Sequence, residues 1–170
     1  MTRYIALLRA VNVGGTGKLA MADLKAICTD AGYGRVATYI QSGNVVFESG
    51  ASAASVKAEL EARLLVHAGG RIGVVVRTAD EMQAVLNGNP FAGKPPNFTV
   101  AIFLDEPPPS DALDRAVGKA DEEMALGIRE IYVHYGAGMG RSKLKIPAAK
   151  LGTARNMNTI AKLLAMAEET

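Results

Sequence analysis

The sequence has one cysteine, two histidines and no tryptophan among its 170 residues. A single thiol, Cys28, cannot form an intramolecular disulfide, and His67 and His134 lie too far apart in the chain to complete a Cys/His metal cluster. We therefore expect no metal and no cofactor. Cys28 follows Met21 and Leu24 at helical spacing, so it is interpreted as a buried small hydrophobic residue and not as a nucleophile.

The sequence also lacks a long apolar run. No segment approaches the roughly 20 apolar residues that a membrane-spanning helix needs. The apolar start of the chain is interrupted by Arg9 and Asn12, and no small-residue cleavage site follows it, which is not typical of a secretory signal. We therefore expect no membrane association and a cytoplasmic location.

One region of the chain has no negatively charged residues. Residues 134–167 contain six Lys and Arg but no Asp or Glu, whereas the whole chain has 19 Lys and Arg against 17 Asp and Glu, a net charge of +2. Outside this region 13 cations face 17 carboxylates, a net charge of −4. This asymmetry indicates an anionic partner without naming it. Elsewhere, Glu122 and Glu123 are interpreted as solvated charges.

Apolar periodicity in the first half predicts a ferredoxin-like βαββαβ unit, in an α+β protein. The helix after the first two-strand hairpin is expected to begin at Ser52 or Ser55. The expected elements are a strand at 4–11, a helix at 21–31, strands at 36–41 and 45–48, a helix reaching residue 67 and a strand at 72–77.

The second half predicts a partial ferredoxin-like βαββα unit followed by a C-terminal helix. Thr78 is expected to cap a connecting helix, Ser110 a short helix, and Asn156 the terminal helix through residue 168. Between them we expect a strand at 98–104, a hairpin at 123–126 and 129–135, and a helix or helical turns at 142–150 broken at Pro147. The expected domains are residues 1–77, a connecting segment 78–97, and residues 98–170.

Two glycine-rich segments fall short of the nucleotide-binding motifs that they resemble. The segment 14–19 lacks the first glycine of a P-loop, where the chain has Asn12, and the magnesium-binding hydroxyl, where it has Leu19. The segment 136–141 has Arg141 in place of the third glycine of a dinucleotide fingerprint. A P-loop or Rossmann-type site is therefore disfavoured.

A βαββαβ unit also raises the hypothesis of an RNA-recognition module. The segment 42–48 has only Phe47 where such a module carries several stacking aromatic residues. Sequence-specific RNA binding is therefore disfavoured, while contact with a nucleic-acid phosphate backbone stays open.

Polar segments rich in glycine, amide and guanidinium groups are the candidate ligand-binding residues. Arginine can grip an anion bidentately, amides can orient it, and glycine lets backbone N–H groups approach. The alternative is that Asn156 only caps a helix, that Arg155 pairs with an internal carboxylate, and that residues 41–44 form only a hairpin tip. The candidate residues are Arg9, Asn12, Gly14, Gly15, Gln41, Ser42, Asn44, Arg141, Lys143, Arg155, Asn156 and Asn158.

Four blocks of the chain, 4–15, 38–47, 140–144 and 153–160, together resemble a bacterial family of small proteins catalogued as a domain of unknown function. The blocks include the strings IALLRAVNVGG, TYIQSGNVVF and TARNMNT, and the resemblance implies an α+β fold with ferredoxin-like subdomains. The chain departs from the family pattern at Ala10, where glycine is usual, and at Met157, where an aromatic residue is usual. The resemblance implies no activity.

The favoured hypothesis is a protein that binds a small molecule carrying phosphate or carboxylate. A second hypothesis is an enzyme that acts on a phosphorylated small molecule, although no nucleophile, base or metal site is evident. A third is an interaction or self-association module with a basic face, and the oligomeric state is left open.

Overall fold

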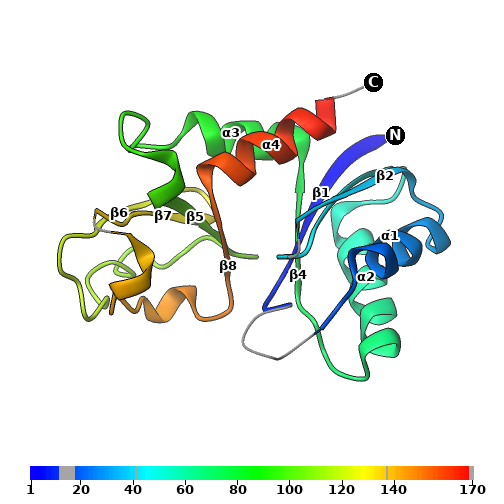
Figure 1. Cartoon of the computed structure of the whole chain (residues 1–170), viewed down its shortest axis with the longest axis horizontal. Helices are drawn as coiled ribbons and strands as arrows, with labels where there is room; N and C mark the ends of the chain where they lie inside the picture. Colours follow the sequence, from blue (N-terminus) through cyan, green and yellow to red (C-terminus); the bar gives the residue numbers. More distant parts are fainter. Residues whose placement is uncertain (12–17, 41, 137, 169–170) are drawn as a thin grey trace. The chain divides into compact units, whose positions relative to one another are not determined.

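The computed structural model of the chain describes residues 1–11, 18–40, 42–136 and 138–168. The described residues form two four-stranded sheets and four α-helices (Figure 1). The strands are β1 Thr2–Leu8, β2 Gly34–Tyr39, β3 Asn44–Ser49, β4 Val74–Thr78, β5 Thr99–Phe103, β6 Glu123–Leu126, β7 Glu130–His134 and β8 Thr153–Asn156. The helices are α1 Met21–Asp30, α2 Ala53–Ala68, α3 Ala79–Asn87 and α4 Met157–Glu168.

Contacts between Cα atoms divide the chain into two compact units. The first comprises Met1–Gln83 together with Lys162–Thr170, and the second comprises Ala84–Ala161. The division therefore falls inside α3 and inside α4, and the first unit is built from two separate segments. The domain boundaries expected from the sequence stay a prediction.

The first unit is the predicted ferredoxin-like βαββαβ fold. Its strands follow the order β2-β3-β1-β4 and all neighbours are antiparallel, with Ile5 of β1 opposite Val46 of β3 and Arg77 of β4. α1 and α2 cover one face of this sheet, where Phe47 stacks on Tyr33 with ring centroids 4.5 Å apart. This face buries alternate strand residues against the apolar stripes of both helices, as a period of two on strands and 3.6 on helices requires.

Helices α2 and α3 begin at side-chain caps, whereas α1 follows Ala20 without one. Ser52 Oγ accepts a hydrogen bond from the Ser55 N–H at 3.2 Å, so the first of the two expected caps is used. At α3, Thr78 Oγ1 accepts from the Glu81 N–H at 3.1 Å and Glu81 Oε1 accepts from the Thr78 N–H at 2.9 Å. This reciprocal pair is a capping box, and it confirms the predicted start of the helix.

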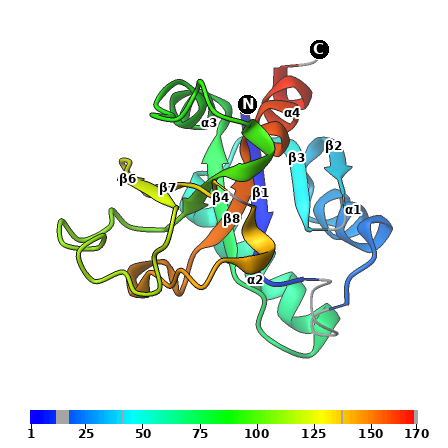
Figure 2. The ribbon, with the colours of Figure 1, turned by 60° about the vertical axis from the view of Figure 1, so that its left-hand side comes forward.

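The second unit repeats the strand order of the first. Its order β6-β7-β5-β8 matches β2-β3-β1-β4 strand for strand, and all neighbours are again antiparallel. In each unit the fourth strand runs directly into a helix, α3 after β4 and α4 after β8, as Figure 2 shows for α4. The helices that cover the sheet of the first unit are replaced here by turns at 110–115 and by the short 3₁₀ segments Met139–Arg141 and Pro147–Ala149.

The second unit departs from the sequence predictions in two segments and contains one strand that was not predicted. Residues after Ser110 form successive turns without becoming a helix. The segment 142–150 is extended up to a single 3₁₀ turn at Pro147, because Lys145 exchanges both backbone hydrogen bonds with Val117. Strand β8 was not expected at all, although it supplies the edge that pairs with β5.

Candidate functional site

Two predicted site residues of the first unit that the structure describes, Ser42 and Asn44, belong to one tight turn. The Leu8 N–H donates to the Gly43 carbonyl at 2.9 Å. Gly43 has φ +88°, and a Cβ there would lie 2.6 Å from Val11 Cγ2, so only glycine fits. The turn thus lies against the end of β1, which Arg9 directly follows in the sequence.

Asn44 is fully buried, and its amide holds this turn together. Its Nδ2 donates to the Tyr39 carbonyl and to Ser42 Oγ, both at 2.9 Å. The side chain of Arg9 lies across Gly73, where a Cβ would be 3.3 Å from Arg9 Cδ. Asn44 and Ser42 therefore shape the hairpin tip. Asn12, Gly14, Gly15 and Gln41 lie outside the described residues.

The second unit contains a small cavity that includes Arg141 and Lys143, two of the predicted site residues. Its volume is about 140 Å³, and both cationic side chains are exposed. The lining residues come from two segments, 118–122 and 138–143: Gly118, Ala120, Asp121, Glu122, Gly138, Arg141, Ser142 and Lys143.

Backbone contacts join the two walls of this cavity. The Val117 N–H donates to the Lys145 carbonyl at 2.9 Å, and the Lys145 N–H donates back at 2.8 Å. Gly118 has φ +75°, and a Cβ there would lie 2.1 Å from the Lys143 carbonyl oxygen. The walls are therefore held in register by bonds that a ligand does not have to form, which is preorganisation.

Glu122 and Ser142 make a second link across the cavity. Glu122 is only 2% exposed; Ser142 Oγ donates to its Oε2, and the Ala120 N–H donates to its Oε1 at 2.6 Å. The hydrogen bond from Ser142 and then that from Ala120 lower the pKa of Glu122 below its usual value. A carboxylate with a lowered pKa is a weak base, so this pair does not favour nucleophilic catalysis by Ser142.

Glu122 corrects an expectation, because the sequence interpretation treated it as solvated. Its neighbour Glu123 is exposed and pairs with Lys94 at 2.8 Å, as a surface carboxylate should. The two adjacent glutamates lie on opposite sides of the start of β6, so one faces inward where Ser142 can reach it. Ser142 is 20 positions away from Glu122 in the sequence, so no local sequence pattern indicates this hydrogen bond.

The remaining predicted residues lie at the junction of β8 and α4. Asn156 Oδ1 accepts from the Thr159 N–H at 2.9 Å, which confirms the predicted cap, and Asn158 is exposed in the first turn. Arg155 is 7% exposed and donates to Thr153 Oγ1 at 2.6 Å and to the Ala154 carbonyl at 3.0 Å. Burial lowers the pKa of Arg155 to about 10. None of these residues lines the cavity beside Arg141.

Arg155 has a counterpart in the first unit that sequence analysis missed. Arg77 precedes the cap Thr78 as Arg155 precedes the cap Asn156, and it is 1% exposed. Each donates to the carbonyl of the preceding residue, Arg77 to Val76 at 3.2 Å. The usable signal was an arginine placed directly before a helix cap at the end of a strand in both halves.

The model of a family described as “Protein of unknown function (DUF1697)” matches residues 1–132. The chain belongs to the DUF1697 family. The resemblance expected from the sequence is therefore confirmed. The family is described as one of unknown function.

A solved structure described as that of the conserved bacterial protein SP0830 from Streptococcus pneumoniae is similar to this DUF1697 chain. The two are 27% identical, with a TM-score of 0.81 over 98% of this chain and 99% of that chain. No curated protein matches the chain. Among the described residues, no helix is both long and apolar enough to span a bilayer.

Proposed function

We propose that the second unit of this DUF1697 protein binds the phosphate or carboxylate group of a small ligand in the cavity beside Arg141 and Lys143. The single observation that supports the proposal is that two exposed cations line a preformed cavity whose walls are tied together by backbone bonds. An anion there would be bound by guanidinium and ammonium groups, and arginine offers a bidentate fork.

The charges in the cavity differ in what they offer a ligand. Arg141 and Lys143 are balanced formally by Asp121 and Glu122. Glu122 is buried and both of its oxygens accept hydrogen bonds, whereas both cations are exposed. The accessible charges are therefore two cations and the exposed carboxylate of Asp121, which leaves a positive surface for an anion.

The volume of the cavity limits how much of the ligand it takes. About 140 Å³ is below the roughly 300–1,000 Å³ of pockets that enclose whole small molecules. One anionic group fits, and the remainder of the ligand would lie outside. This supports a terminal phosphate or carboxylate as the recognised part.

The proposal is tested by thermal unfolding of the full chain with phosphate, pyrophosphate, citrate and a nucleoside monophosphate. A ligand at a hundredfold its dissociation constant stabilises by about 2.7 kcal/mol. For a chain of this size that raises the unfolding midpoint by roughly 5–10 °C. Chloride at matched ionic strength controls for screening.

Variants separate the cavity from general charge. Arg141→Gln with Lys143→Gln should abolish the shift, whereas Lys25→Gln, which removes an exposed cation of the first unit, should keep it. A shift that survives the double variant, or no shift with any anion, contradicts the proposal.

A further inference from the structure

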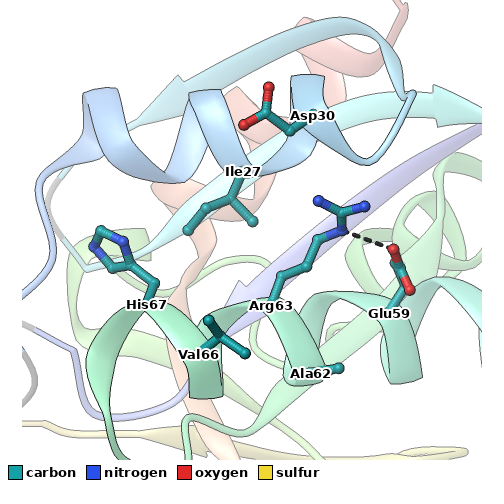
Figure 3. Close-up of a pocket in the computed structure, with 7 residues that line it drawn as sticks. All are labelled: Ile27, Asp30, Glu59, Ala62, Arg63, Val66 and His67. Carbon is teal, nitrogen blue, oxygen red and sulfur yellow. Dashed lines mark hydrogen bonds and ion pairs between the residues drawn. The ribbon is translucent and has the colours of Figure 1, made fainter.

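A groove lies between α1 and α2 on the outer side of the first unit. Its volume is about 440 Å³, and Figure 3 shows Ile27 pointing from α1 toward the side chains of α2. Val66 is 87% exposed, and Leu65 beside it is 49% exposed. The lining residues are Ile27, Asp30, Glu59, Ala62, Arg63, Val66 and His67.

Both helices present a second stripe to this groove, separate from the stripe that they bury. On α1 the stripe is Asp23, Ile27 and Asp30, at steps of four and three. On α2 the core takes Val56, Leu60 and Leu64, while the groove takes Glu59, Ala62, Arg63, Val66 and His67. The groove thus runs along about two helical turns, roughly 10 Å.

The charges around the groove are not balanced. Arg63 Nε lies 2.7 Å from Glu59 Oε1, and His67 Nε2 lies 3.7 Å from Asp23 Oδ2. Asp30 makes no side-chain hydrogen bond or ion pair with any residue that the structure describes. The lining carboxylates of Asp30 and Glu59, together with that of Asp23 beside His67, outnumber the cationic groups, so the apolar side chains of the groove lie next to a net negative charge.

We propose that this groove binds a basic amphipathic segment of another protein. An apolar side chain of that segment would cover Ile27, Ala62 and Val66, and a lysine or arginine beside it would pair with Asp30. Helical partners bind helix grooves in this way, with an apolar anchor surrounded by charged contacts that set specificity. The surface is on the other unit from the anion cavity and has the opposite sign, so the two proposals stand or fall separately.

The test measures fluorescence anisotropy of a labelled helical peptide with leucine on one face flanked by lysine, titrated with the full chain. One matched peptide replaces each lysine with glutamate, and another replaces each leucine with serine. We expect binding of the first peptide alone, and a dissociation constant that rises as salt is added.

Two variants and two controls locate the contact. Asp30→Lys and Val66→Ser should each weaken binding about tenfold or more. Asp114→Lys and Ile128→Ser make the same changes on exposed residues of the second unit, Ile128 being 77% exposed, and should leave binding within about twofold.

The proposal is overturned if the lysine–leucine peptide does not bind, if the glutamate peptide binds equally well, or if the control variants lose as much affinity as the groove variants. Sedimentation velocity gives a further check. A multimer of the free chain that becomes a monomer in Asp30→Lys would show that a second copy occupies the groove, which also overturns the proposal.

Discussion

Gly118 touches the backbone of Lys143 so closely that a methyl group at position 118 would lie 2.1 Å from the Lys143 carbonyl oxygen. The approach brings the 118–122 wall of the anion cavity against its 138–143 wall. Because the obstructing atom belongs to the backbone, no side-chain rotation can relieve the overlap.

Gly118→Ala should therefore lower the free energy of unfolding by more than backbone strain alone, which is about 1–3 kcal/mol for a residue held at positive φ. Gly32→Ala is the matched control, because Gly32 has φ +88° and no atom within 4 Å of the added methyl group. Urea denaturation of both variants gives the difference. Equal losses would show that the contact at Lys143 is loose.

Ser142→Ala removes the hydrogen bond that contributes most to lowering the pKa of Glu122. A carboxylate with a lowered pKa stabilises the folded state above its unfolded pKa, and this stabilisation is lost as pH falls through the folded pKa. The variant should therefore lose less stability than the wild type on acidification from pH 6 to below the usual glutamate value of 4.5. Ser110→Ala, an exposed serine, should follow the wild-type curve, and an identical curve for Ser142→Ala would refute the link.

Ala10→Gly should stabilise the protein, because Ala10 has φ +52°. The left-handed region costs an L residue roughly 1–2 kcal/mol, which glycine does not incur. The greater conformational freedom of glycine in the unfolded chain offsets about half of this gain in stability. We expect a net increase of about 0.5–1 kcal/mol in the free energy of unfolding. The same change at Ala26, exposed inside α1, should instead lower it by roughly 0.5–1 kcal/mol. A loss in both variants would argue against strain at position 10.

Cys28 should resist alkylation in the native protein. Burial raises the pKa of its thiol from 9.0 to about 12, so almost no thiolate forms at pH 8.5. Iodoacetamide labelling followed by mass spectrometry should show an unmodified native chain and one adduct after unfolding in guanidinium. Because the unfolded thiol loses its proton first, folding stability should also fall as pH rises above 9.0. Rapid native labelling at pH 8.5 would contradict the burial.

The first unit could be predicted from the sequence because its signals are local. Apolar periodicity gave the strands and helices, and the caps at Ser52 and Thr78 gave the helix starts to within a residue. The positive φ of Ala10 is a local reason for the glycine that the family resemblance leads us to expect at this position.

The second unit was harder because long-range pairing overrides its local pattern. In the segment 143–146 the exposed Lys143 and Lys145 alternate with the less exposed Leu144 and Ile146, which is a strand period that we interpreted as a helix. β8 was missed because its buried positions are Thr153 and Arg155, whose polarity hides a period of two.

The candidate site was predictable only in part. Charge patterning found Arg141 and Lys143, but nothing near Glu122 in the sequence indicates that Ser142 binds it. A contact between residues twenty positions apart depends on the tertiary fold, and it fixes the wall that the two cations share.

Arg3 Nε donates to the Ala167 carbonyl at 3.0 Å, and Arg3 Nη2 donates to the Met166 carbonyl at 3.2 Å. During translation, the strand that carries Arg3 leaves the ribosome long before α4 has been synthesised. The first strand of this sheet thus waits for partners that lie 163 and 164 residues further along the chain, and it makes these contacts only after α4 has emerged.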